Sequence, residues 1–174
     1  AGNDTLSSVA LVAPWLHDGE IVEAVYGGAN GVDALVETSR EAEAAAAAGE
    51  PMIIDAAGPE GSDALMAMDG YYSDPERGAI EAYDNRFDLT SWEPWLTFDA
   101  VAVAERLDTP TLFVHSEAAA IPDGVRAFTD RFAGEATQRW LEDVTQFDFY
   151  DDPAAVETSA DAVAEHFART LPSS

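Results

Sequence analysis

The chain has 174 residues, of which 47% are hydrophobic, so one domain or most of one can bury a sizeable core. It has no cysteine, which excludes a disulfide framework and a thiolate metal site. Its 34 acidic and 8 basic residues give a formal net charge of −26, and this charge opposes binding to the phosphates of nucleic acids.

The acidity indicates adaptation to high salt rather than an acidic tail, because the acids are spread along the chain. All 8 basic residues are arginine. Molar salt shortens the Debye length to about 3 Å and screens carboxylate repulsion. The composition resembles that of proteins from salt-accumulating haloarchaea. No apolar run reaches the length of a membrane span, and residues 1–8 lack a signal-peptide pattern. We therefore expect a cytoplasmic protein of a high-salt cell that binds neither membrane nor nucleic acid.

The first half of the chain predicts one strand followed by helices. The continuous apolar run at residues 7–16 is typical of a buried strand in a parallel sheet. Helical spacing of apolar residues over 21–25 predicts a helix that the pair at 27–28 ends. A second helix is expected to begin at Asp33 and to run through the alanines at 44–48.

The middle of the chain predicts a less regular segment. Residues 51–58 predict a short strand, and Ser62 or Asp63 is expected to cap a short helix after it. Residues 72–100 are rich in aromatic and turn residues, which indicates short helices packed by their own aromatic side chains. These side chains are Tyr83, Phe87, Trp92, Trp95 and Phe98.

The last sixty residues predict strand, helix, strand and helix, which is a parallel α/β unit with right-handed crossovers. The strands are expected at 111–115 and 137–144, and the helices are expected to begin near Pro122 and at Pro153. The apolar face predicted for the last helix consists of Val156, Ala160, Val163 and Phe167. Catalytic and binding residues of open α/β sheets lie in loops after the strands. Three such loops are expected.

At this point the sequence resembles the C-terminal half of an α/β-hydrolase-fold protein of the dienelactone-hydrolase-like group. Four segments carry the resemblance, which covers nearly the whole chain: VALVAPWLHD, YDNRFDLTSWEPWLTFDA, TPTLFVHSEA and VTQFDFYD. They are similar to strand six and its loop, the region before strand seven, strand seven, and strand eight with the histidine loop. The resemblance implies a parallel sheet with core segments at 1–20 and 100–174 and a helical cap inserted at 21–99. It also implies hydrolysis of carboxylic esters or lactones.

The family's nucleophile lies before strand six, on a G-x-S-x-G turn or on a cysteine. This chain has neither; Ser62 has the wrong glycine spacing and fits a helix N-cap better. The resemblance therefore implies an N-terminal segment or partner chain that completes the sheet and carries the nucleophile. The first strand also predicts such a partner, since it would otherwise expose an unpaired edge. A homo-oligomer is another way to cover that edge.

The two other triad positions are altered in this chain. Ala119 stands where the family has the aspartate, and Gln146 stands where the family has the histidine. Glutamine has no titratable nitrogen, so it cannot act as the general base. A catalytic alternative would need Glu117 as the acid and His115 or His17 as the base.

Each candidate residue also has a structural interpretation. His115 lies in an apolar strand and is expected to be a buried sheet residue, whereas His17 is expected in a surface loop or at a ligand cavity. His166 is expected to be structural, and the dispersed histidines predict no metal site. Asp148, Asp151 and Asp152 are expected to cap the last helix.

A pocket for a small apolar or ester-like ligand is expected near five aromatic or histidine side chains, with no cofactor. These are Trp15, His17, Trp92, Trp95 and Phe147. The tryptophans equally fit the core of the inserted segment. Three interpretations stay open: an ester or lactone hydrolase with a degenerate acid–base site, a non-catalytic binding or scaffold subunit, and a small independent flavodoxin-like domain.

Overall fold

The computed structural model describes residues 6–68 and 70–171. The chain divides into two compact units, Ala1–Ile21 with Asp99–Ser174, and Val22–Phe98. We call the first the sheet unit and the second the inserted unit. Residues 1–5, which belong to the stretch without a signal-peptide pattern, lie outside the described residues. No helix in the described part of the chain is both long and apolar enough to cross a membrane.

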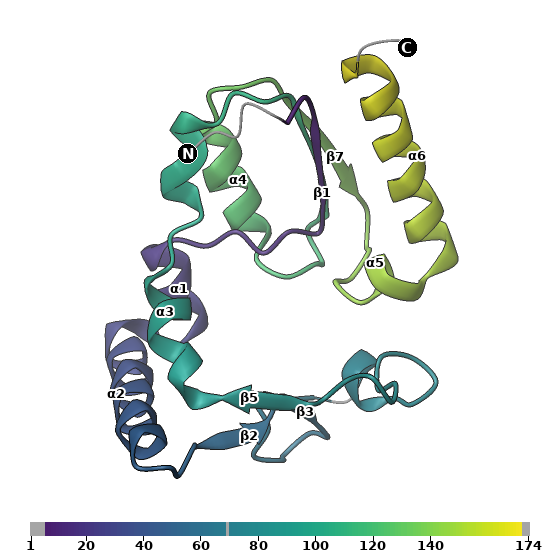
Figure 1. Cartoon of the computed structure of the whole chain (residues 1–174). Helices are drawn as coiled ribbons and strands as arrows, with labels where there is room; N and C mark the ends of the chain where they lie inside the picture. The colour runs from purple at the N-terminus through teal and green to yellow at the C-terminus, as the bar shows by residue number, and fades with distance from the viewer. Residues whose placement is uncertain (1–5, 69, 172–174) are drawn as a thin grey trace. The chain divides into compact units, whose positions relative to one another are not determined.

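The sheet unit contains a three-stranded parallel sheet in the order β1-β6-β7 (Figure 1). Its strands are β1 (Val9–Val12), β6 (Thr111–Ser116) and β7 (Ala136–Leu141). All residues of the central strand β6 are buried, as expected for a strand with neighbours on both edges and helices on both faces. The predicted parallel-sheet α/β fold is confirmed.

Helices cover both faces of this sheet (Figure 1). Helix α4 (Pro122–Arg131) packs Val125 and Phe128 against Phe113. Helices α5 (Asp148–Asp151) and α6 (Pro153–Thr170) belong to the core cluster on the other face, around Leu112 and Val114. Successive side chains of a strand point to opposite faces, which explains why the neighbours Leu112 and Phe113 enter different cores. The 3-10 helix η3 (Val101–Arg106) packs with α4.

Helix α6 begins as predicted, but its buried face differs from the prediction. Asp152 caps the helix, since its Oδ1 accepts hydrogen bonds from the backbone N–H groups of Ala154 at 3.1 Å and Ala155 at 2.9 Å. The predicted apolar face is wrong for Val156, which is 40% exposed, and for Ala160, which is also exposed. The buried residues of α6 are Ala155, Ser159 and His166. Polar side chains can occupy this face because they are hydrogen-bonded there, as when Ser159 Oγ donates to the Ala155 carbonyl at 2.7 Å.

The inserted unit is held by helices and very short strands. Its helices are α1 (Gly19–Val25, which crosses the boundary between the units), α2 (Gly28–Ala47) and α3 (Trp92–Thr97), with 3-10 helices η1 (Tyr71–Ser73) and η2 (Leu89–Ser91). Strands β2 (Ile53–Asp55) and β5 (Arg86–Asp88) pair antiparallel, and β3 (Ala57–Gly58) and β4 (Met66–Ala67) pair parallel. The core consists of Val22, Ala42, Leu89, Trp92 and Leu96.

Two predictions for the inserted unit are wrong in detail. Helix α2 begins at Gly28, five residues before the expected Asp33, because Gly27 and Gly28, at φ 86° and 75°, together reverse the chain between α1 and α2. Residues 62–68, the described part of this stretch, do not form the short helix expected after Ser62, and strand β4 lies there instead. The backbone N–H of Met66 donates to the Ala56 carbonyl at 2.9 Å, so this segment meets its hydrogen-bonding needs by pairing rather than by a helical turn.

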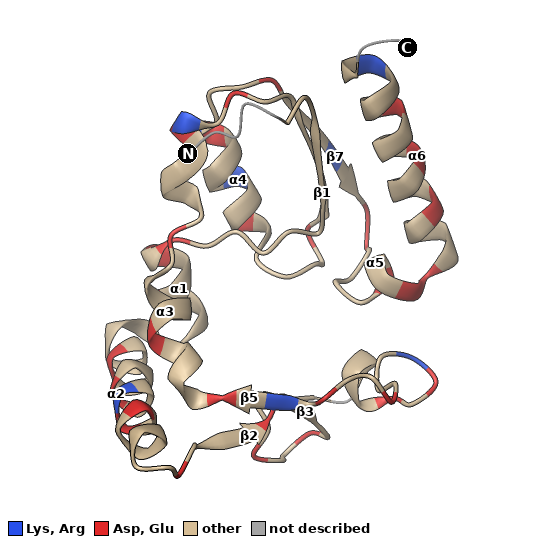
Figure 2. Cartoon of the chain, viewed as in Figure 1, with Lys and Arg blue, Asp and Glu red and all other residues tan. Residues whose placement is uncertain are grey.

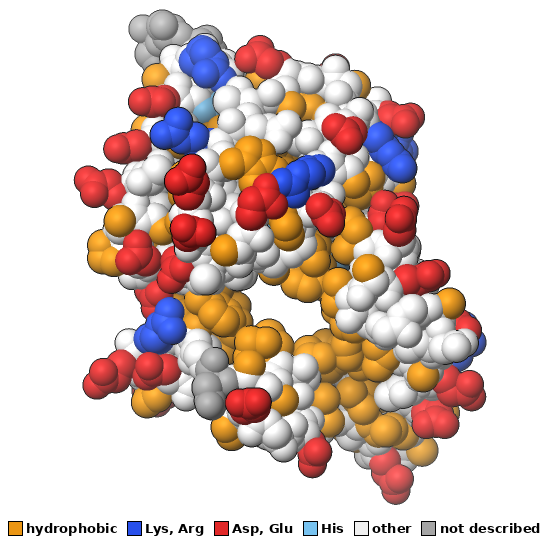
Figure 3. Space-filling view, turned by 180° about the vertical axis from the view of Figure 1, so that it is seen from behind, with side chains coloured by type: hydrophobic (Ala, Val, Ile, Leu, Met, Phe, Trp, Pro, Cys, Tyr) orange, Lys and Arg blue, Asp and Glu red, His pale blue; other side chains and the backbone are white. Residues whose placement is uncertain are grey.

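The charged residues follow the sequence expectation. Acidic residues occur on helices and loops of both units (Figure 2). On the face drawn in Figure 3, acidic side chains are scattered over the surface rather than gathered in one patch. Any single carboxylate is therefore a poor indicator of a site, and the candidate site must be built from geometry.

Candidate functional site

The carboxyl ends of the three parallel strands lie at the same edge of the sheet, and each strand is followed by a loop with an unusual backbone. Ala13 after β1, Ile121 after β6 and Asp143 after β7 have φ values of 44°, 42° and 56°. Non-glycine residues are rare in this left-handed region, and such residues cluster at functional sites. Among the described residues, Asn85 of the inserted unit is the fourth non-glycine residue of this kind.

Gln146 joins these three loops through its side-chain amide. Its Nε2 group donates to the carbonyl of Ala13 at 3.3 Å and to the hydroxyl of Tyr150 at 3.0 Å. Its Oε1 accepts from the backbone N–H of Ala120 at 3.2 Å. The orientation of the amide follows from these partners, because a carbonyl can only accept and a backbone N–H can only donate.

The structure brings together the two positions at which the resemblance implies an acid and a base. Gln146 bonds to Ala120, the residue directly after the buried Ala119. The side chain of Gln146, on the loop after β7, meets the backbone of Ala120, on the loop after β6. This contact contains neither a carboxylate nor an imidazole. A glutamine amide and an alanine methyl group cannot exchange a proton with a substrate near neutral pH.

Glu117 has a different partner. Its carboxylate forms an ion pair with Arg126 of α4, and the Glu117 side chain is 67% exposed. Arg126 also lies 3.3 Å from Asp123 and stands over the ring of Trp140, at 4.4 Å from the ring centroid. These contacts hold Glu117 at the surface beside α4.

His115 is buried in the sheet, as one of its sequence interpretations expects. It is 1% exposed, and its ring centroid lies 5.5 Å from that of Trp140. Its Nδ1 lies 2.9 Å from the backbone N–H of Ser116, whereas its Nε2 has no hydrogen-bond partner among the described residues. A base enclosed in this way has no path to a substrate without movement of the strand.

His17 is also buried, at 2% exposed, so the expectation of a surface position is wrong. The loop after β1, which carries His17, packs closely against the start of α4, since a Cβ atom at Gly124 would lie 1.7 Å from the Leu16 carbonyl oxygen. Trp15 Nε1 donates to His17 Nδ1 at 2.9 Å, which leaves the ring proton of a neutral His17 on Nε2. Close backbone packing explains the burial.

The aromatic candidates fall into the two units. Trp15 and Phe147 belong to strand-end loops of the sheet unit, and the Phe147 ring lies 6.1 Å from that of Tyr150. Trp92 is part of the inserted unit's core, with ring contacts to Tyr26 at 5.3 Å and Phe87 at 5.2 Å. Trp95 is partly exposed and donates from Nε1 to the Tyr26 hydroxyl at 3.0 Å.

Electrostatic perturbations occur within the inserted unit. Burial raises the pKa of Tyr26, and the hydrogen bond from Trp95 partly offsets that rise. The hydrogen bond from Arg40 lowers the pKa of the Glu93 carboxyl. In the described part of the chain, no group of three or more His, Asp or Glu side chains could hold a metal ion.

Sequence reasoning missed the partners of Gln146. Tyr150 follows Gln146 by four residues, and this helical spacing places two side chains side by side, so the pair could have been predicted. The bonds to Ala13 and Ala120 join residues 133 and 26 positions away, and no local pattern indicates them.

No family model and no curated protein matches the chain. Solved structures do match it. An α/β hydrolase, GrgF, from Penicillium sp. sh18 is similar with a TM-score of 0.66 and 17% identity, over 95% of this chain and 57% of that one. A hypothetical protein from Pseudomonas aeruginosa gives a TM-score of 0.71 and 16% identity, over 95% and 54%. A monoacylglycerol lipase from Paleococcus ferrophilus gives 0.56 and 16%, over 95% and 60%.

These likenesses show that the chain has the α/β-hydrolase fold. At such low identity they show the fold and not an activity. The chain spans a little more than half the length of the matched structures.

Proposed function

We propose that this chain is part of an α/β-hydrolase-type protein that binds small esters or lactones and has lost the acid–base pair needed to hydrolyse them. The supporting observation is the side chain of Gln146, the residue at which the resemblance implies the catalytic histidine: from the loop after β7 it bonds to the loops after β1 and β6 and to Tyr150 of α5. The dienelactone-hydrolase-like group remains the proposed relative.

The chemical argument is that the amide of Gln146 is already fully engaged in structure. Both hydrogens of its Nε2 group have acceptors, and its Oε1 has a donor. A Ser-His-acid mechanism needs a base that takes a proton from the nucleophile and returns it to the leaving group. Gln146 can instead hold the three strand-end loops together.

A catalytic alternative would use Glu117 with His115 or His17. The geometry favours it less, because both rings are buried and Glu117 pairs with Arg126. Activity by this route would require the backbone around His115 or His17 to rearrange and the ion pair between Glu117 and Arg126 to break. The binding role requires no rearrangement of the contacts described above.

We further propose that an N-terminal segment or a partner chain completes the sheet at β1. Among the described residues, β1 pairs with β6 alone, so its other edge presents unpaired backbone groups. Val156 and Ala160 of α6 are also exposed, so no other described part of the sheet unit covers them. The greater length of the matched structures supports such a segment, and a second copy of this chain is the alternative occupant.

The oligomeric state tests this part of the proposal. Sedimentation of the chain in molar KCl should show an assembly, or a monomer whose β1 amides exchange with solvent much faster than those of β6. A folded monomer with β1 and β6 equally protected would contradict an open edge. The same series in dilute buffer tests the proposed high-salt cytoplasm, since −26 charges should destabilise the fold when screening is lost.

The ligand-binding role can be tested by NMR titration with a small lactone and with p-nitrophenyl acetate in molar KCl. We expect the resonances of Gln146, Ala120 and Ala13 to shift in a saturable way, without hydrolysis above the buffer rate. A wild-type rate above buffer that disappears in Glu117→Gln or His115→Ala would overturn the loss of chemistry. Absence of any shift at the three loops would overturn the binding role.

A matched pair of variants controls for accidental catalysis. Gln146→His places an imidazole at the altered triad position, and Gln138→His places one on the exposed strand β7. Free imidazole accelerates ester hydrolysis by itself, so only a difference between the two variants is informative. We expect equal rates. A clearly faster Gln146→His variant would show that the loops still hold a working catalytic arrangement and would contradict our proposal.

A further inference from the structure

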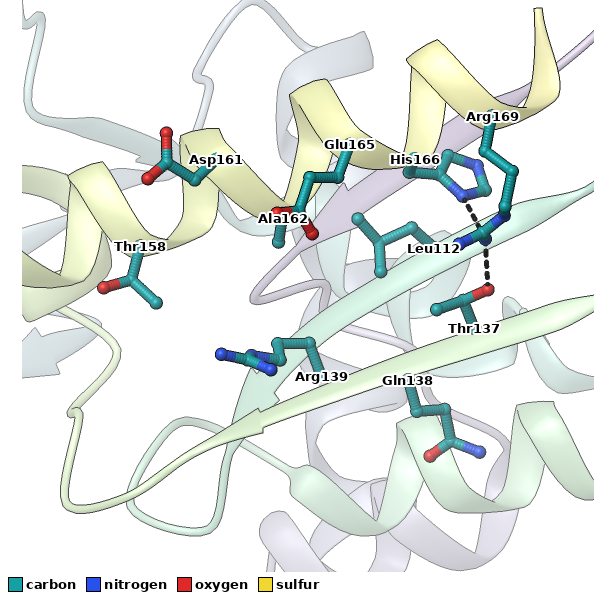
Figure 4. A pocket seen from close by; sticks show the side chains of 10 residues that line it. All are labelled: Leu112, Thr137, Gln138, Arg139, Thr158, Asp161, Ala162, Glu165, His166 and Arg169. Atoms are coloured by element: carbon teal, nitrogen blue, oxygen red, sulfur yellow. Dashed lines mark hydrogen bonds between the residues drawn. The ribbon is translucent and has the colours of Figure 1, made fainter.

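The far side of the sheet unit holds a cavity of about 340 Å³ between β7 and α6 (Figure 4). It is lined by Thr137 and Arg139 from β7 and by Asp161, Glu165 and Arg169 from α6, among others. Because the sheet order is β1-β6-β7, a segment that completes the sheet at β1 leaves this cavity uncovered. The cavity is therefore separate from the strand-end loops and from the proposed partner edge.

The charge balance of the cavity differs from that of the chain. Acidic residues outnumber basic ones 34 to 8 in the sequence, whereas Arg139 and Arg169 face Asp161 and Glu165 here in equal number. A region with such a balance offers both signs of charge to a ligand. The surrounding excess of carboxylates would repel a simple anion before it arrived.

Three of these four charges are available for a ligand. In the part of the chain that the structure describes, Arg139, Asp161 and Glu165 form no ion pair within 4 Å. Arg169 is engaged: its Nη2 donates to Thr137 Oγ1 at 2.8 Å and lies 3.9 Å from Glu135. Opposite charges that line one cavity without pairing to each other are partners that a bound molecule can bridge.

The wall behind these charges is fixed by a chain of hydrogen bonds through the buried His166. Arg169 can only donate, so His166 Nδ1, 3.3 Å away, is the acceptor, and the ring proton lies on Nε2. That proton is donated to Ser8 Oγ at 2.9 Å, which leaves the Ser8 proton for Thr170 Oγ1 at 2.7 Å. The Thr170 hydroxyl donates to the His166 carbonyl at 2.7 Å. Each donor in this chain of hydrogen bonds has an acceptor, so this wall of the cavity is rigid and keeps its shape when a ligand binds.

We propose that this cavity binds a small zwitterion, a molecule with a carboxylate and an ammonium group a few atoms apart. The carboxylate pairs with the guanidinium of Arg139, which can donate two parallel hydrogen bonds. The ammonium group pairs with Glu165, which extends from α6 towards β7, and Asp161 adds a second carboxylate to the lining of the same cavity (Figure 4). A singly charged molecule would meet attraction on one side and repulsion on the other, whereas a zwitterion is attracted on both.

The test is an NMR titration of the chain with β-alanine and with its two halves, propionate and ethylammonium, at constant KCl concentration. Arginine Nε–H resonances are the readout, since the chain has 8 arginines and no lysine. We expect saturable shifts at Arg139 with β-alanine, at an apparent Kd about tenfold lower than for either half. Equal affinity for β-alanine and propionate would overturn the zwitterion proposal, and so would the absence of saturable shifts.

Variants distinguish the cavity from general charge effects. Arg139→Gln and Glu165→Gln should each weaken β-alanine binding about tenfold, because each removes a hydrogen-bonded charge. Arg126→Gln is the matched control, since Arg126 is also an exposed arginine but lies over Trp140 outside this cavity. A loss of binding in Arg126→Gln equal to that in Arg139→Gln would contradict the assignment. In the described part of the chain, Arg139 and Glu165 form no hydrogen bond or ion pair with the strand-end loops, so failure of Arg139→Gln and Glu165→Gln leaves the proposed ester or lactone binding unaffected.

Discussion

The sheet unit and the inserted unit are ordered by different kinds of contact. In the sheet unit, β6 pairs along its whole length with β7 and through four residues with β1, and its side chains are buried on both faces. In the inserted unit, strands of two or three residues pair once, and the core lies among helices α2, η2 and α3. Backbone pairing dominates the first unit, and side-chain packing dominates the second.

The difference shows where each unit is sensitive to substitution. In the sheet unit, loops and helices approach so closely that backbone meets backbone, as at Gly124 and Leu16. In the inserted unit, a single buried hydroxyl joins two helical segments: Ser39 Oγ donates to the Thr90 carbonyl at 2.8 Å and accepts from the Glu93 N–H at 3.1 Å. Four substitutions or conditions test this comparison.

Gly124→Ala should have the largest effect and should act on the sheet unit. The added Cβ would lie 1.7 Å from the Leu16 carbonyl oxygen, so the loop after β1 must separate from α4. We expect a loss of about 3 kcal/mol in the free energy of unfolding, measured by urea denaturation. Gly19→Ala is the control, because nothing lies within 4 Å of its Cβ position. Equal stability of the two variants would show that the loop is not packed as described.

Ser39→Ala should be the most damaging polar deletion in the inserted unit. It leaves the Thr90 carbonyl and the Glu93 N–H without their partner at a fully buried position. We expect a loss of about 2 kcal/mol. Thr38→Ala, next to it, should change little, since the Thr38 hydroxyl donates only to the Ala34 carbonyl of its own helix. Both substitutions raise helix propensity, so a loss in Ser39→Ala no larger than that in Thr38→Ala would contradict the importance of the buried bridge.

The sheet unit is also easier to predict from the sequence than the inserted unit. The apolar run at 111–115 and Pro153 preceded by Asp152 are local signals, and the structure has β6 at Thr111–Ser116 and a capped α6. The fold class could be predicted because the elements alternate in a regular order. The irregular inserted unit gave weaker signals, and there the helix expected after Ser62 is wrong.

For the candidate site, a resemblance supplied residue positions and no contacts. The positions of Ala119 and Gln146 came from a resemblance, and the structure adds that their loops touch. The residue before His17, Leu16, approaches Gly124, more than a hundred residues away, and no periodic pattern reveals this packing. The buried face of α6 was missed because hydrogen-bonded Ser159 and His166 replace apolar residues there. Long-range polar contacts set these features.

Gln146→Leu should loosen the strand-end loops of the sheet unit by a smaller amount. The substitution removes the acceptor of the Ala120 N–H and the donor to the Ala13 carbonyl at a half-buried position, so we expect a loss of about 1 kcal/mol. Hydrogen exchange of the Ala120 amide should accelerate. Gln138→Leu serves as the control, since Gln138 is exposed and accepts only from Trp140 Nε1. An unchanged exchange rate at Ala120 would mean that Gln146 does not hold the loops together.

Alkaline pH should have the smallest effect and should loosen the inserted unit first. Burial raises the pKa of both Tyr26 and Tyr83, which belong to this unit. Unfolded tyrosines lose their protons near pH 10, whereas these two keep theirs to higher pH in the folded state. The folded state therefore binds more protons above pH 10, and the stability that these groups contribute, complete below pH 10, is lost as the pH rises towards their folded pKa values.

Methyl NMR resonances of Val22 and Leu96 in the inserted unit, followed against those of Val114 and Val125 in the sheet unit, can show the order of these losses in molar KCl. We expect the inserted unit to change at lower pH, and Tyr26→Phe to move its transition towards that of the sheet unit, since phenylalanine cannot ionise. Tyr26→Phe also removes the acceptor of Trp95 Nε1, but Trp95 is partly exposed and water can replace it. A sheet unit that loosens first would mean that ionisation of buried tyrosines does not set the alkaline limit of the fold.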